Sequence, residues 1–132
     1  MSQTEVEKKI NEHLSAGWST EIQWKNQRKV PATTSWLAVK LLQFQGIPNR
    51  DKTEICRIIY NFGIFTTDTN AYALSDLLES LKVLFEYRDL QSENYIIRFG
   101  KFDIAMLPEL VENQRVIQHC SVNVTGKAYR RK

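Results

Sequence analysis

The side chains of this 132-residue chain that could supply a nucleophile or a base are few and widely spaced. The two histidines are His13 and His119, and the two cysteines are Cys56 and Cys120. Adjacent residues of a strand point to opposite faces, so His119 and Cys120 are poorly placed to form a catalytic pair. Neither cysteine has a second Cys or a His at a metal-ligand spacing. We interpret both cysteines as buried small hydrophobic residues and His119 as a surface or interface histidine.

Acidic residues and glycines form no recognisable catalytic or nucleotide-binding motif. Asp103 and Glu109 could suggest a nuclease carboxylate pair, but no following strand brings the further acid and lysine, and we interpret both as solvated loop acids. The five glycines are scattered, so the chain contains neither a P-loop nor a dinucleotide-binding fingerprint. We therefore predict a protein that is not an enzyme, with no catalytic residue, no cofactor and no metal site.

Aromatic and basic residues raise the question of nucleic-acid binding. Trp18, Trp24 and Trp36 lie close together in the sequence, near Arg28 and Lys29, and such a set can form a stacking platform for single strands. The strand-like alternation around Trp24 and Trp36 favours core or subunit contact instead. The net charge is only +3, and much of the excess lies in the last six residues. We expect a basic tail over residues 127–132, capable of weak, salt-sensitive contact with phosphates.

Composition and length indicate one globular domain, which we place at residues 1–126. The hydrophobic fraction is 42% and the charged fraction 25%, and no long apolar run is present. These values exclude a disordered or membrane-spanning chain. The N-terminus lacks the basic and apolar stretches of a secretory signal, so we expect synthesis in the cytoplasm.

The sequence predicts two amphipathic helices, which should cover one face of the sheet. Thr4 and Glu7 have the spacing of a capping box, so the first helix should begin there and end near Gly17. Its apolar stripe is Val6, Ile10 and Leu14. The second helix should follow the possible caps in 66–70 and run from 71 to 85.

The remaining apolar segments alternate as strands do. We predict strands at 20–24, 36–44, 53–65 and 116–124, with either two short strands or one strand broken at Gly100 over 94–106. In the strand at 36–44, both faces carry apolar residues: Trp36, Ala38, Leu42 and Phe44 on one, and Leu37, Val39 and Leu41 on the other. The order of elements predicts an α+β fold, an antiparallel or mixed β-sheet with two α-helices packed on one face.

Five short segments in this order carry a resemblance to a known family. They are Ile-Gln-Trp-Lys-Asn at 22–26, Ser-Trp-Leu-Ala-Val at 35–39, Gly-Ile-Phe at 63–65, Ala-Tyr-Ala-Leu-Ser-Asp-Leu-Leu at 71–78 and Val-Asn-Val at 122–124. Their order and spacing resemble the tail terminator, or tail-completion, proteins of long-tailed bacteriophages of the lambda type. The resemblance covers most of residues 5–125.

The resemblance implies a structural protein of the virion, located at the head-proximal end of the tail. Members form a six-fold ring that caps the tail tube, stops its polymerisation and joins it to the head. The implied partners are other copies of the chain, the major tail tube protein and a head-completion or stopper protein, with no membrane. Nucleic acid would be limited to weak contact by the basic tail or the ring lumen. Another head–tail connector, or a small nucleic-acid-binding phage protein, remains the alternative.

A ring with heterologous contacts needs two different, complementary surfaces on each subunit. We predict that these surfaces lie on two strands and that a loop at 25–34 reaches the tube or the neck. The candidate interface residues are Leu37, Val39 and Leu41 on the second strand, Arg57, Ile59 and Asn61 on the third, and Lys25, Arg28 and Lys29 in the loop.

Overall fold

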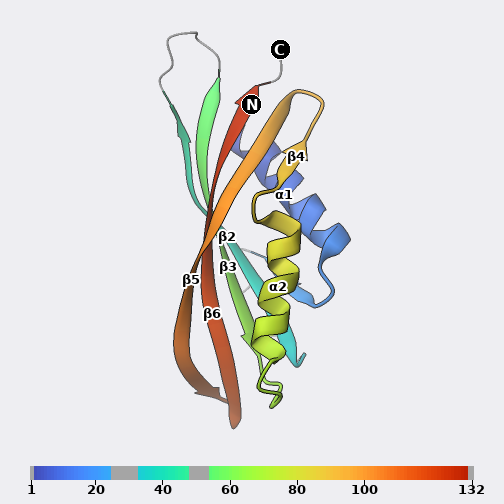
Figure 1. The fold of residues 1–132 in the computed structure, drawn as a ribbon, viewed down its shortest axis with the longest axis vertical. Helices are drawn as coiled ribbons and strands as arrows, with labels where there is room; N and C mark the ends of the chain where they lie inside the picture. Colours follow the sequence, from blue (N-terminus) through green and yellow to red (C-terminus); the bar gives the residue numbers. More distant parts are fainter. Residues whose placement is uncertain (1, 25–32, 48–53, 131–132) are drawn as a thin grey trace.

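The computed structural model describes residues 2–24, 33–47 and 54–130, and its fold is α+β, as predicted. In chain order the elements are α1 (Gln3–Gly17), β1 (Glu21–Gln23), β2 (Ser35–Gly46), β3 (Ile55–Thr66), α2 (Ala73–Phe85), β4 (Asp89–Gln91), β5 (Tyr95–Glu112) and β6 (Arg115–Arg130). The strands form one mixed sheet in the order β1-β2-β3-β6-β5-β4, in which only β1 and β2 are parallel. Both helices lie against the same face of the twisted sheet (Figure 1). We call this the inner face and the opposite one the outer face.

Helix α1 begins two residues earlier than the sequence pattern indicated. Ser2, not Thr4, is the N-cap, and its hydroxyl oxygen accepts a hydrogen bond from the amide of Glu5 at 3.2 Å. Ser2 and Glu5 have the same Ser/Thr-x-x-Glu spacing as Thr4 and Glu7, so the sequence offered two overlapping starts. The predicted stripe of Val6, Ile10 and Leu14 is confirmed, since all three are fully buried.

Helix α2 begins at Ala73, after two side chains that stabilise the preceding turn. The Asp68 carboxylate accepts a hydrogen bond from the amide of Asn70, and the Asn70 side-chain oxygen accepts one from the amide of Tyr72, both at 2.9 Å. These are local Asx-type bonds, which fix the turn without capping the helix itself. The buried residues of α2 are Leu74, Leu81 and Phe85.

The core lies between the helices and the inner face, and aromatic rings form its centre. The Phe62 ring of β3 lies 4.9 Å from the Phe85 ring of α2 and 5.0 Å from the Tyr60 ring, between centroids. The Tyr60 hydroxyl donates to the Asn11 side-chain oxygen of α1 at 2.8 Å, and the Tyr95 hydroxyl donates to the Glu5 carbonyl at 2.8 Å. The core therefore ties α1 to the sheet by hydrogen bonds as well as by apolar contact.

A bulge in β2 changes which residues face the core. Leu41 is paired with Tyr60 and Gln43 with Ile59, so Leu42 is one extra residue on β2. An extra residue reverses the alternation beyond it. Phe44 therefore packs against the core on the inner face, and the prediction that it shares a face with Trp36 is wrong.

Strand β5 is a single strand of 18 residues that continues past Gly100 and past Pro108. Its pairing with β6 shifts by one residue between Phe99 and Phe102 and again between Leu107 and Leu110. The first bulge is fixed by the C-cap residue of α2, because the Glu86 carboxylate accepts a hydrogen bond from the amide of Phe102 at 2.8 Å. The sequence pattern ended this strand at 106, whereas the observed strand contains Pro108, a residue type that usually interrupts a strand.

Strand β6 is also longer than predicted, and it absorbs most of the expected basic tail. It extends to Arg130, and Ala128 is fully buried between β3 and β5. Residues 127–130 thus belong to the sheet rather than to a tail, because their backbone groups are paired on both sides. The boundary at 126 is wrong, and residues 131 and 132 lie outside the described part of the chain.

Candidate functional site

The outer face of the sheet is a surface that the helices leave uncovered. Along β3 it presents Ile55, Arg57, Ile59, Asn61 and Phe65, which alternate with the buried residues of the inner face. Three of the predicted interface residues, Arg57, Ile59 and Asn61, therefore share this face. Their role in an interface stays a prediction.

The predicted interface on β2 is wrong. Leu37 is fully buried and Val39 is 6% exposed, and both belong to the core under the helices. Leu41 packs against the same core. Both faces of β2 carry apolar side chains, so alternation alone could not show which of them the helices cover. The loop residues Lys25, Arg28 and Lys29 lie outside the described residues.

A row of stacked rings crosses the outer face at the end of the sheet nearest the β5–β6 turn. Trp36 of β2 and Phe65 of β3 are stacked with centroids 5.3 Å apart, and Phe65 and His119 of β6 are stacked at 5.3 Å. The Arg115 guanidinium lies 5.7 Å from the Trp36 centroid. The row is a set of cross-strand neighbours, which is the contact that stabilises a pleated surface. Trp36 is buried, but on the outer face and not in the core under the helices.

Polar groups occupy the middle of the outer face. The Asn61 amide donates to the Asn123 side-chain oxygen at 2.8 Å and to the Ser121 hydroxyl at 2.9 Å. Because these bonds satisfy the amide donors within the face, Asn61 organises the surface more than it offers free donors to a partner.

Basic side chains form a second row, toward the other end of the same face. Arg57 of β3 is in register with Lys127 of β6, and Lys127 is in register with Arg98 of β5. Arg98 forms an ion pair with Asp89 at 3.6 Å, and its guanidinium lies 5.8 Å from the Tyr129 centroid. No ion pair among the described residues involves Arg57 or Lys127. We call Arg57, Lys127 and Arg98 the basic row; sequence reasoning missed it because it depends on strand register.

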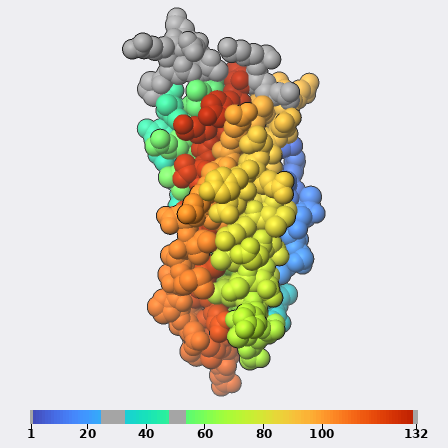
Figure 2. Space-filling view, in the orientation of Figure 1, coloured from blue at the N-terminus to red at the C-terminus, as the bar shows by residue number. Residues whose placement is uncertain are grey.

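The β5–β6 hairpin carries the other surface that sequence reasoning missed. Its end is closed by Asn113 and Gln114, both with positive φ, as in a two-residue turn. We call residues 106–116, which contain this turn, the arm. Five apolar side chains of the arm are exposed: Met106, Leu107, Leu110, Val111 and Val116. The arm forms the lower end of the molecule in Figures 1 and 2.

The structure does not bring the possible catalytic side chains together in one site. Cys120 is buried on the inner face, while His119 lies on the outer face, where its Nε2 atom is 2.8 Å from the Pro108 carbonyl oxygen. Burial raises the pKa of the Cys120 thiol to about 11 and also raises that of Cys56. Both cysteines are buried, as predicted. Asp103 and Glu109 are exposed, but they lie on β5 rather than in a loop.

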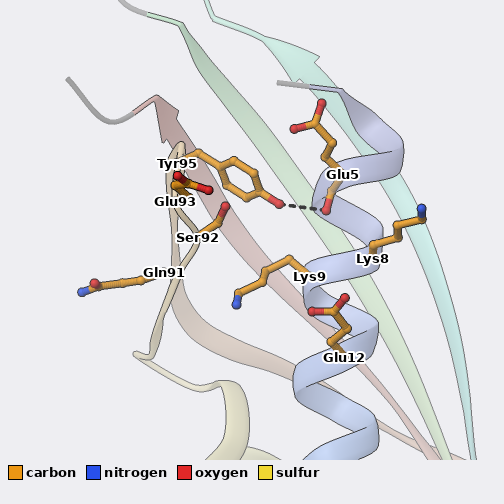
Figure 3. Close-up of a pocket in the computed structure, with 8 residues that line it drawn as sticks. All are labelled: Glu5, Lys8, Lys9, Glu12, Gln91, Ser92, Glu93 and Tyr95. Atoms are coloured by element: carbon orange, nitrogen blue, oxygen red, sulfur yellow. Dashed lines mark hydrogen bonds between the residues drawn. The ribbon is translucent and has the colours of Figure 1, made fainter.

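A hollow of about 490 Å³ lies between α1 and the β4–β5 connection (Figure 3). It is lined by Glu5, Lys8, Lys9 and Glu12 of α1 and by Gln91, Ser92, Glu93 and Tyr95. Charges of both signs alternate along it, so it has no consistent preference for an anion or a cation. Within the described residues, no group of three or more His, Cys, Asp or Glu side chains could hold a metal ion. None of the described helices is long and apolar enough to cross a bilayer.

Comparison with known proteins supports the fold and goes no further. No protein-family model matches the chain, and no curated protein matches it. Sixteen chains of solved structures do match. One of them is similar over 100% of this chain and 97% of its own length, with a TM-score of 0.61 and 15% sequence identity. At that identity the similarity is one of architecture.

Proposed function

We propose that this chain is a structural assembly protein that works through its surfaces, as a tail terminator of a long-tailed bacteriophage. In this role copies of the chain form a ring, six-fold in the family it resembles, on the head-proximal end of the tail tube. The ring stops tube growth and joins the tail to the head through a stopper protein. The order of sequence segments that resembles the terminator family supports the choice of this role.

The observation that carries the proposal is the division of the molecule into a closed core and two uncovered surfaces. The inner face is filled by α1 and α2, whereas the outer face and the arm have no cover within the described residues. The arm exposes 63% of Met106 and 75% of Val111. Contiguous exposed apolar residues of this kind are typical of protein–protein contact sites.

A tube-capping experiment tests the proposal. The purified chain is added to the polymerising tail tube protein of the same phage genome, and tube lengths are measured by negative-stain electron microscopy. We expect shorter tubes that carry a ring at one end, with the number of ends increasing as more chain is added. Tubes of unchanged length with bare ends, in the presence of excess folded chain, would refute the proposal.

Nucleic-acid binding is the competing function, and the basic row is the observation that favours it. Fluorescence anisotropy with labelled duplex DNA at two salt concentrations separates the two. Tight binding that weakens steeply with salt, without any effect on tubes, would favour the nucleic-acid-binding alternative.

A further inference from the structure

The arm has two kinds of uncovered surface, exposed apolar side chains and an unpaired strand edge. Its apolar side chains are exposed on both strands, including 75% of Val111 and 51% of Val116, which are in register with each other. It also has a free edge, because β4 pairs with β5 only at Ile96–Arg98, far from the turn. Residues 86–88 still bond to β5 as far as Phe102, but from Asp103 to the turn β5 has no strand neighbour on that side within the described residues. Exposed strand edges of this length are usually covered in a native assembly.

The arm is also acidic. Glu109 and Glu112 lie on its β5 strand, and neither takes part in an ion pair among the described residues. Arg115 is in register with Glu112, but its guanidinium lies over the Trp36 ring. The arm therefore offers two carboxylates beside an apolar surface.

The basic row has the complementary charge. Arg57 and Lys127 are cross-strand neighbours, and like charges in that position repel each other. An anionic group placed between them would remove this repulsion. Ile59 lies next on the same face of β3 and is half-buried, so the row also borders apolar surface.

The two surfaces cannot meet within one molecule. Arg115 marks the arm end of β6 and Lys127 marks the basic row, twelve residues further along the same strand. At about 3.3 Å per residue, these positions are roughly 40 Å apart. The sheet that separates them is rigidly paired on both sides of β6.

We infer that the arm of one copy docks on the outer face of a second copy, with Glu109 and Glu112 directed at Arg57 and Lys127. Leu107 and Leu110, which lie on the same face of the arm as Glu112, then cover the apolar surface beside the row. The contact joins two different patches, so it is heterologous and can close into a ring. This inference rests on the proposed function and names the surfaces through which the copies assemble.

A charge-swap experiment tests the pairing. Three variants are compared with the unaltered chain: Glu109→Lys with Glu112→Lys on the arm, Arg57→Glu with Lys127→Glu on the outer face, and all four changes together. The matched control is Asp76→Lys with Glu79→Lys on the exposed side of α2, which changes the net charge as much as the arm variant does. Self-association is measured by sedimentation velocity over a range of protein concentrations, and folding by circular dichroism.

We expect the arm and outer-face variants each to weaken self-association by about tenfold or more, since juxtaposed like charges cost several kcal/mol. The variant with all four changes should recover association to within about threefold of the unaltered chain, and the α2 control should stay close to it.

Equal association of all variants, or a folded four-change variant that does not recover, would overturn the inference. If the chain still caps tubes in that case, the proposed function stands and only the pairing fails. An unaltered chain that neither self-associates nor caps tubes refutes both.

Discussion

Replacing Leu37 by alanine tests whether this residue belongs to the core or to an interface, because the two roles predict opposite results. Leu37 is fully buried under the helices, in register with the buried Ile64 of β3. Truncating a buried leucine removes its transfer free energy and leaves a cavity, which together cost about 2–5 kcal/mol. The native stability of a small domain is only about 5–15 kcal/mol, so the loss is a large share of it.

Leu42 provides the matched control on the same strand. Its side chain is 48% exposed at the β2 bulge, so Leu42→Ala should cost no more than about 1 kcal/mol. Urea unfolding followed by tryptophan fluorescence measures both variants. With a slope of about 2 kcal/mol per molar urea, a loss of about 3 kcal/mol lowers the midpoint by about 1.5 M.

The reasoning fails if Leu37→Ala and Leu42→Ala lower the midpoint equally. It also fails if Leu37→Ala leaves the midpoint unchanged and instead weakens self-association, which is the result expected of an interface residue. An altered slope for Leu37→Ala would mean either that the surface exposed on unfolding has changed or that unfolding is no longer two-state, and calorimetric unfolding would then replace the urea measurement.

Three further predictions concern the bulge of β5, the hairpin turn and pH. Glu86→Ala should lower the unfolding free energy by about 1–3 kcal/mol, because the Phe102 amide loses a charged acceptor. Glu86→Gln should lower it less, since it keeps an acceptor oxygen. Urea unfolding of the two variants measures the difference. Gln114→Gly should raise the unfolding free energy by roughly 0.5–1 kcal/mol, and with it the melting temperature, because glycine adopts φ 63° without strain. An unchanged or lower melting temperature would contradict this prediction. The buried Cys120 thiol, with its pKa raised from 9.0 to about 11, stabilises the fold fully below pH 9, and that contribution is lost as the pH rises through 11. Urea midpoints measured from pH 8 to 11 should therefore fall more for the unaltered chain than for Cys120→Ala.

Helices were the part of the fold that the sequence could predict well, because a helix is specified locally. The spacing of Val6, Ile10 and Leu14 fixes which side of α1 is buried, whatever it packs against. The start of α1 was less certain, since Ser2 and Thr4 both satisfy the capping pattern and only the backbone hydrogen bonds choose between them.

The faces and the registers of the strands depend on residues far apart in the chain. A single extra residue at Leu42 moves Phe44 to the core, and no local signal marks it. The basic row exists because Arg57 pairs with Lys127, seventy residues later. The arm carries no clear sequence signal, because Pro108 interrupts the strand pattern and the turn of Asn113 and Gln114 lacks the glycine typical of such hairpins. The candidate surfaces were therefore the part of the molecule that sequence reasoning located least well.

The two bulges of β5 also determine how this protein can be aligned with distant relatives. Each bulge adds one residue to β5 relative to β6, at 100–101 and at 108–109. The first insertion reverses the alternation of faces and the second restores it, so only the stretch between them is out of phase. Against a relative that lacks both insertions, an alignment without gaps would superpose the same faces on either side of this stretch but opposite faces within it. An alignment with such a relative therefore needs single-residue gaps at these two places before any surface residue is compared.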